Sequence, residues 1–240
     1  MSYRFYSNSL LGIGKVSLFA EEARHVAVTR IRLGEKVILF NGDGYDYISV
    51  FNGMDRREAH FRVEEITPNG RERSNHLIIG APLPKGDREQ FMIEKLVELG
   101  IAGFVPLETE RSKIHPEPKR LDRLKKHVIE ASKQCGRSQL MQIGSLTPWH
   151  EFLATKKENQ LGWVAHGPNK SQLSMHKIDA INDPTLGAIG PEGGLTDKEV
   201  EQAQVSGWKV VELGKRIMRI EHISFTCQRL ELTCNNICSS

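Results

Sequence analysis

The residues best suited to chemistry lie at positions 190–194, which read Gly-Pro-Glu-Gly-Gly. Gly190, Gly193 and Gly194 have no Cβ, so a flat ligand could lie directly against their backbone. The spacing matches neither the phosphate-binding pattern GxxxxGKS/T nor the dinucleotide pattern GxGxxG, so phosphates would not be the main anchor of such a ligand. The alternative is a tight connection from a strand to a helix, but three glycines, a proline and a glutamate exceed what that connection needs.

A second candidate run covers residues 212–222 and leaves an apolar segment through Gly214. If this run is a turn that enters a helix, Arg219 and Glu221 could point into one pocket. A guanidinium suits the stabilisation of an anion there, because it stays charged and presents a planar fork of donors. An exposed Arg/Glu surface at the start of a helix explains the same residues equally well.

Positive charge is concentrated at residues 111–137, which hold nine Lys or Arg and three Asp or Glu, whereas the whole chain carries a net charge of only +3. Such a cluster indicates a polyanion such as RNA or DNA, and the alternative is a solvated helix face. Within it, Gln134 offers a donor and an acceptor, and Arg137 offers a planar fork. Arg30 and Arg32 also lie close together, but residues 1–75 are nearly neutral, with 11 basic and 10 acidic residues.

The composition is that of a globular protein, with 240 residues, 39% hydrophobic and 26% charged. No apolar run approaches the length of a membrane span, and the N-terminus lacks the apolar core of a signal peptide. The four cysteines form no CxxC pair and the histidines show no metal-binding spacing, so we predict no metal site and a reducing, cytoplasmic location. His166 is a lone histidine, for which a structural or solvated role is the usual one.

Five short apolar runs provide the elements that must position these residues: 77–81, 103–107, 161–165, 186–189 and 209–213. Helical periodicity over 88–99 and 121–135 lies between them, and Gly100 suits the left-handed residue after the first helix. Thr196 and Glu199 fit a capping box after residues 190–194, which we call the glycine run. We therefore expect an α/β fold with a parallel sheet, in which the carboxyl ends of the strands form the ligand-binding edge.

The first 66 residues are β-rich by pattern, with strands at 15–18, 35–40 and 45–51 and a short helix at 21–28. Positions 41–44 read Asn-Gly-Asp-Gly, which is strong turn chemistry. The polar segment 67–75 marks a boundary. The sequence thus predicts a small β barrel or sandwich at 1–72 and an α/β domain at 73–240.

Five motifs in order carry a family resemblance, the first of them split between residues 83–87 and 94–100. Residues 83–87 read Leu-Pro-Lys-Gly-Asp, 94–100 Glu-Lys-Leu-Val-Glu-Leu-Gly, 110–112 Glu-Arg-Ser and 130–137 Glu-Ala-Ser-Lys-Gln-Cys-Gly-Arg; the glycine run and residues 213–221 follow. With them, nearly the whole chain resembles the bacterial 16S ribosomal RNA uracil-N3 methyltransferases of the SPOUT class. The resemblance implies a PUA-like RNA-binding β domain at 1–72 and a SPOUT methyltransferase domain with a trefoil knot at 73–240.

The resemblance also implies a cofactor, S-adenosyl-L-methionine, and a homodimer that acts on 16S rRNA in the small ribosomal subunit. Arg219 would stabilise the uracil anion, and Glu221 would orient Arg219 or accept the N3 proton. Arg30, Arg32, Arg111, Gln134 and Arg137 would bind the RNA. The cofactor site would be lined by His166, Ile189, Gly190, Pro191, Glu192, Gly193, Gly194, Leu213, Gly214, Ile217 and Met218.

The chain departs from the family pattern at the last motif. Where Leu-Arg-Thr-Glu-Thr-Ala is expected, residues 218–223 read Met-Arg-Ile-Glu-His-Ile, so Ile220 and His222 replace two hydroxyl-bearing residues. Three alternatives remain open: a ribose 2′-O methyltransferase of the same class, an RNA-binding ribosome-assembly protein without a cofactor, and an α/β enzyme with a nucleotide cofactor. The missing phosphate-binding spacings disfavour the last of these.

Overall fold

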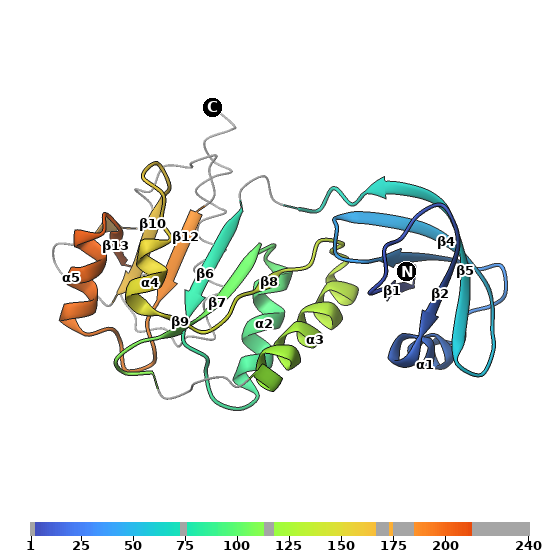
Figure 1. Cartoon of the computed structure of the whole chain (residues 1–240), viewed down its shortest axis with the longest axis horizontal. Coiled ribbons are helices and arrows are strands. Elements are labelled where there is room, and N and C mark those ends of the chain that lie inside the picture. Colours follow the sequence, from blue (N-terminus) through green and yellow to red (C-terminus); the bar gives the residue numbers. More distant parts are fainter. Residues whose placement is uncertain (1–2, 73–75, 113–117, 167–172, 175–184, 213–240) are drawn as a thin grey trace. The chain divides into compact units, whose positions relative to one another are not determined.

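The computed structural model describes residues 3–72, 76–112, 118–166, 173–174 and 185–212 (Figure 1). The chain divides into two compact units, and each is considered by itself. The first contains residues 1–72 and 129–140, and the second contains residues 73–128 and 141–240. None of the described helices combines the length and hydrophobicity that crossing a lipid bilayer requires.

The first unit is a five-stranded sheet in the order β1-β3-β4-β5-β2. Its helix and sheet enclose an aromatic and aliphatic core that includes Phe5, Phe51 and Phe61. Gly42 and Gly44 have φ of 99° and 93°, which confirms the predicted turn between β3 and β4. The elements are β1 (Arg4–Tyr6), β2 (Gly14–Phe19), α1 (Ala20–Thr29), β3 (Lys36–Phe40), β4 (Tyr45–Met54) and β5 (Glu58–Pro68).

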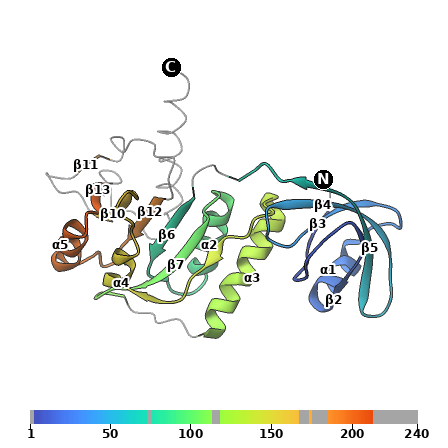
Figure 2. The ribbon, with the colours of Figure 1, turned by 45° about the horizontal axis from the view of Figure 1, so that its top comes forward.

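The second unit is built on a sheet in the order β11-β13-β10-β12-β6-β7-β8, with β9 paired to β7, and every described pair is parallel. Figures 1 and 2 both show β10, β12, β6 and β7 side by side. The strands are β6 (Leu77–Ala81), β7 (Gly103–Glu108), β8 (Gln142–Ile143), β9 (Thr147–Pro148), β10 (Gly162–His166), β11 (Leu173–Ser174), β12 (Thr185–Ile189) and β13 (Lys209–Glu212).

Four helices connect these strands: α2 (Arg88–Glu98), α3 (Pro118–Cys135), α4 (Trp149–Ala154) and α5 (Asp197–Val205). The end of α3 is grouped with the first unit. Gly100 has φ of 73°, and the N–H groups of Gly100 and Ile101 donate to the carbonyls of Val97 and Leu96 at 3.0 and 3.1 Å. These two hydrogen bonds end α2 at the residue that the sequence predicts.

The predicted parallel sheet is confirmed, and its five main strands lie where the apolar runs place them. The short elements β1, β8, β9, β11 and α4 and the strand β5 are additional to those predicted. Helices α4 and α5 share one apolar cluster with the sheet, in which Trp149, Phe152 and Trp208 are buried. The implied trefoil knot concerns a part of the chain whose residues 167–172, 175–184 and 213–240 lie outside the described ones.

Candidate active site

Three neighbouring strands end level with one another at one edge of the sheet. Ala165 of β10 pairs with Ile189 of β12 on one side and with Val211 of β13 on the other. His166 pairs with Glu212 in the same register. The segments that follow these strands therefore start side by side at the carboxyl edge, which is where open α/β sheets bind ligands.

The glycine run after β12 is a tight turn held by its own backbone. The Gly194 N–H donates to the Pro191 carbonyl at 2.8 Å, and Gly194 has φ of 71°, a left-handed conformation that favours glycine. A Cβ at Gly190 would lie 2.8 Å from Cγ of Leu195. Two of the three glycines are thus required by the turn itself, apart from any ligand.

A buried carboxylate fixes the exit of this turn. Glu199 is 6% exposed, and its side chain accepts hydrogen bonds from Thr196 N at 2.8 Å and Thr196 Oγ1 at 3.1 Å. Thr196 in turn caps α5, so the predicted capping box is confirmed. Glu199 also accepts from the backbone N–H of Glu110 at 2.8 Å. This additional bond joins the start of α5 to the segment after β7, which the sequence pattern does not reveal.

A cleft of about 460 Å³ lies beside the glycine run, within the range of about 300–1,000 Å³ that small-molecule sites occupy. Segments 82–85, 110–112 and 191–193 line it, together with Arg88. Arg111 Nη1 donates to the carbonyl of Gly193 at 2.7 Å, and Arg88 forms an ion pair with Glu192. The cleft therefore lies at the carboxyl ends of β6, β7 and β12.

A buried acid supports one wall of the cleft. Glu89 is 2% exposed and accepts hydrogen bonds from Arg120 Nε at 2.6 Å and Arg123 Nη2 at 3.1 Å. Arg120 also donates to the carbonyl of Pro84 at 3.3 Å, in the segment that lines the cleft. Motif spacing gives no sign of Glu89 as a site residue, because its partners come from a helix more than 30 residues away.

The structure brings together some of the residues that the sequence analysis assigns to cofactor binding. Ile189 ends β12, the five residues 190–194 form the turn after it, and half-buried His166 ends the adjacent strand β10. The rest of the set lies outside the described residues, as do both predicted catalytic residues: Leu213, Gly214, Ile217, Met218, Arg219 and Glu221.

The predicted RNA-binding residues fall into different environments. Arg111 is exposed in the cleft, Gln134 is exposed near the end of α3, and Arg30 and Arg32 are exposed in the first unit. Arg137 is instead 4% exposed, and the Glu72 carboxylate accepts from its Nε at 3.0 Å and from its Nη2 at 2.7 Å. This buried pair indicates a structural role for Arg137.

The described part of the basic segment, residues 111–137, is therefore not one exposed face. The Lys133 side chain is 6% exposed and pairs with Glu22 and Glu130. Arg120 pairs with Glu89, while Arg123 and Lys125 remain more than half exposed. Much of the charge excess in the sequence is thus balanced by acids from elsewhere in the chain.

Asp46 is the centre of a hydrogen-bond network within the first unit. It accepts from Arg4 Nη2 at 3.1 Å, from Asn69 Nδ2 at 2.9 Å, and from the hydroxyl of Ser138. Burial acts to raise the pKa of the Asp46 carboxyl, but these hydrogen bonds and the charge of Arg4 outweigh it and hold the pKa below its usual value. Asn69 also donates to the Gly136 carbonyl at 3.1 Å, so the network holds the segment after α3.

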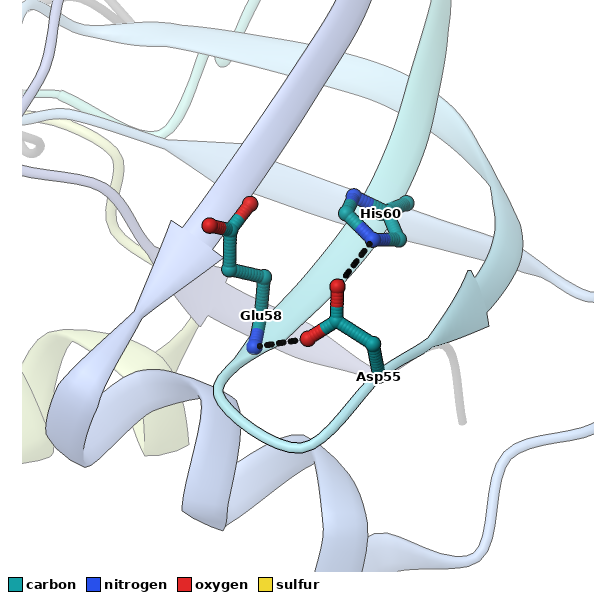
Figure 3. Close-up of side chains that lie close together, drawn as sticks. All are labelled: Asp55, Glu58 and His60. Carbon is teal, nitrogen blue, oxygen red and sulfur yellow. Dashed lines mark hydrogen bonds and ion pairs between the residues drawn. The ribbon is translucent and has the colours of Figure 1, made fainter.

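Among the described residues, one group of side chains has metal-binding composition: Asp55, Glu58 and His60 at the turn between β4 and β5 (Figure 3). Asp55 Oδ1 accepts from the backbone N–H groups of Arg57 and Glu58, both at 3.0 Å, and these bonds lower the pKa of the Asp55 carboxyl. His60 contacts Asp55 through Nε2 and Ser17 through Nδ1. The geometry of a hairpin turn accounts for this group without an ion.

Comparison with known proteins identifies the class that this fold and edge define. A family described as "RNA methyltransferase domain" matches residues 71–227, and a second, "RNA methyltransferase PUA domain", matches residues 20–64. The chain belongs to the RNA methyltransferase family. The predicted fold class, a PUA-like β domain before a parallel-sheet methyltransferase domain, is confirmed.

The relatives specify the branch of that family. The Ribosomal RNA small subunit methyltransferase E of Bacillus subtilis is 28% identical over 216 residues, covering 85% of this chain and 84% of its own. The protein of the same name from Rickettsia conorii is 28% identical over 230 residues, covering 93% and 92%. These matches confirm the resemblance to small-subunit rRNA methyltransferases.

Solved structures agree with the sequence relatives. A Ribosomal RNA small subunit methyltransferase E from Neisseria gonorrhoeae, bound to S-adenosyl methionine, superposes with a TM-score of 0.90 at 26% identity and covers 98% of both chains. A putative methyltransferase from Legionella pneumophila, also with its cofactor bound, gives a TM-score of 0.88 at 25% identity and 98% coverage of both chains.

Proposed function

We propose that this protein transfers a methyl group from S-adenosylmethionine to N3 of a uracil base in 16S ribosomal RNA of the small subunit. The observation that carries the proposal is that β12, β10 and β13 are neighbours in the sheet and end in the same register, beside the glycine run. The relatives' name as small-subunit rRNA methyltransferases and the cofactor bound in two structural neighbours support it.

The described residues fit this cofactor. Ile189 and half-buried His166 end adjacent strands, so the turn after β12, in which Gly193 is exposed, starts beside the segment after β10. Amides of the glycine run would hold the adenosyl and amino-acid ends, and His166 would border them from β10. Leu213, Gly214, Ile217 and Met218 would complete the site. When bound, S-adenosylmethionine would supply a methyl group on a positively charged sulfur: a nucleophilic nitrogen would bond to the methyl carbon while the carbon–sulfur bond breaks, and the sulfur would leave as a neutral thioether.

The protein must make the uracil nitrogen nucleophilic, because N3 carries a proton at neutral pH. We assign Arg219 to stabilising the negative charge that develops on the uracil oxygens as this proton leaves. Glu221 would orient Arg219 or accept the proton from N3. Because N3 lies on the pairing edge of the base, the target uridine must be unpaired when it reacts.

RNA contacts are assigned to Arg30, Arg32, Arg111 and Gln134, which are exposed. Arg137, buried against Glu72, would act indirectly by holding the end of α3. We further propose that residues 1–72 form the RNA-binding domain and residues 73–240 the methyltransferase domain. The protein would act in the cytoplasm as a homodimer, which sedimentation of the purified chain tests directly.

Replacement of Arg219 tests the mechanism. The Arg219→Ala variant should lose methyl transfer to unmethylated small subunits by about 100-fold or more, because removal of one oxyanion-stabilising donor typically costs this much. Calorimetric titration should show S-adenosylmethionine binding close to that of the wild type. Undiminished turnover would remove Arg219 from the mechanism.

Two further outcomes of the same experiment separate the alternatives. Nucleoside analysis of RNA modified by the wild type should show 3-methyluridine, and a ribose 2′-O-methyl product would instead favour the other transferase. A wild type that does not bind S-adenosylmethionine would favour the non-catalytic RNA-binding protein.

A further inference from the structure

The cleft beside the glycine run combines apolar and cationic surfaces. Leu83 is 5% exposed and lies between two buried prolines, Pro82 and Pro84, which line the cleft. Lys85 and Arg111, both exposed, also line it. Flat apolar surface next to cations suits a ligand with a planar base and a phosphate.

The charges of the cleft are unequally balanced. The Glu192 carboxylate forms an ion pair with Arg88, whereas Glu110 accepts a hydrogen bond at 3.3 Å from the neutral hydroxyl of Thr196, which adds no positive charge beside it. Within the described part of the chain, neither Lys85 nor Arg111 has a carboxylate partner. Arg111 uses one N–H on the Gly193 carbonyl, which leaves further donors of its guanidinium for a ligand.

This charge balance distinguishes the two ligands of the proposed reaction. Against two acids, Glu110 and Glu192, the cleft is lined by three cations, Lys85, Arg88 and Arg111, which disfavour the positive sulfonium of S-adenosylmethionine by one net charge. An RNA phosphodiester is an anion, which they attract, and a bound phosphate can accept from the fork of Arg111. The cofactor edge of β10, β12 and β13 and the cleft at β6, β7 and β12 share only the glycine run.

We infer that the cleft binds one nucleotide of the RNA substrate, with its phosphate at Lys85 and Arg111 and its base against residues 82–84. This inference rests on the proposed function and places the acceptor RNA on one side of the glycine run and the cofactor on the other. Lys85 is thereby assigned to substrate binding; it belongs to the motif at residues 83–87, whose presence in the sequence does not by itself indicate a role for this lysine.

The test measures binding of a fluorescent oligouridylate to the full-length protein at several salt concentrations. Lys85→Gln and Arg111→Gln should each weaken binding by about tenfold and reduce the slope of log affinity against log salt by about 0.7, the value for one lost phosphate contact on a single strand. Lys85→Arg should retain most of the affinity because it keeps the charge. Lys157→Gln removes an exposed cation outside the cleft and serves as the matched control.

Calorimetry with S-adenosylmethionine and assays of methyl transfer complete the experiment. The Lys85→Gln variant should bind the cofactor as the wild type does and show a raised KM for small subunits. Unchanged RNA affinity and salt slope in both cleft variants would overturn the inference, and so would loss of cofactor binding with RNA binding intact. A wild type that binds oligouridylate through the cleft but transfers no methyl group would overturn the proposed function and leave the nucleotide site standing.

Discussion

At the scale of single residues, partners decide what a charged side chain does. Arg111 and Arg137 both belong to the basic segment, yet Arg111 faces the cleft and Arg137 is buried against Glu72. Asp46 likewise serves structure, because three side chains donate to it and hold the segment after α3. Removing one partner of such a network leaves the others buried without a partner, which costs more than the bond itself.

Asp46→Asn should lower the free energy of unfolding of the first unit at pH 7 by about 1–3 kcal/mol. Because the pKa of Asp46 is lowered in the folded state, its contribution is present above its unfolded pKa of about 3.9 and is lost as the pH falls through the folded value. The variant should therefore lose less stability than the wild type on acidification below about pH 4. Urea unfolding followed by circular dichroism, at pH 7 and below about pH 4, measures the free energy of unfolding of both proteins.

The control for Asp46→Asn is Asp122→Asn, which removes an exposed carboxylate that pairs with Lys125 on the helix surface. It should change stability by less than about 0.5 kcal/mol. Tryptophan fluorescence provides a second control, because Trp149, Trp163 and Trp208 all lie in the second unit. Equal effects of the two substitutions would contradict the role assigned to Asp46.

At the scale of elements, close packing fixes glycines inside the sheet as well as in its turns. Gly187 of β12 pairs with Trp163 of β10, whose ring is fully buried. A Cβ at Gly187 would lie 2.2 Å from Cζ2 of that ring. β12 therefore needs glycine there, because the Trp163 ring occupies the space of a side chain. The strand that leads into the glycine run is positioned by this contact.

Gly187→Ala should destabilise the second unit by about 1–3 kcal/mol, the usual cost of overpacking a core. The midpoint of thermal unfolding, followed by tryptophan fluorescence, should fall by several degrees. Gly103→Ala is the matched control in the same unit, since a Cβ at Gly103 would lie 3.4 Å from its nearest neighbour, Cγ1 of Ile78, an ordinary contact distance. If the two variants unfold at the same temperature, the packing argument is wrong.

At the scale of the whole molecule, the chain forms two units, each with its own core. The first unit has a β core and exposed arginines, and the second has the parallel sheet, the glycine run and the cleft. Ligand binding should therefore stabilise the units unequally. The edge to which we assign the cofactor is formed by strands of the second unit alone.

S-adenosylmethionine at about 100 times its dissociation constant should raise the unfolding midpoint of the second unit by about 5–10 °C, because binding to the folded state alone contributes about 2.7 kcal/mol. Tryptophan fluorescence isolates this transition, since all three tryptophans are buried there. Methionine or adenosine alone should give a much smaller shift. The absence of any shift at saturating cofactor would contradict the assigned edge.

The sequence by itself determined the five main strands of the second unit, their parallel sheet and the edge that carries the glycine run. These follow from local pattern: apolar runs of strand length, helical periodicity, and turn residues such as those at 41–44 and 190–194. The capping box of Thr196 and Glu199 is equally local and is confirmed. The family resemblance added the cofactor and the reaction, which periodicity alone does not contain.

Only the tertiary structure decided which charges are available for RNA. Arg137 meets Glu72, Lys133 meets Glu22, and Arg120 meets Glu89, across separations of 31 to 111 residues. It also decided that Lys85 and Arg111 line one cleft, because β6 and β7 are adjacent in the sheet and end at the same edge. A charge acts on whatever lies within a few ångströms of it, and folding, not spacing along the chain, sets those neighbours.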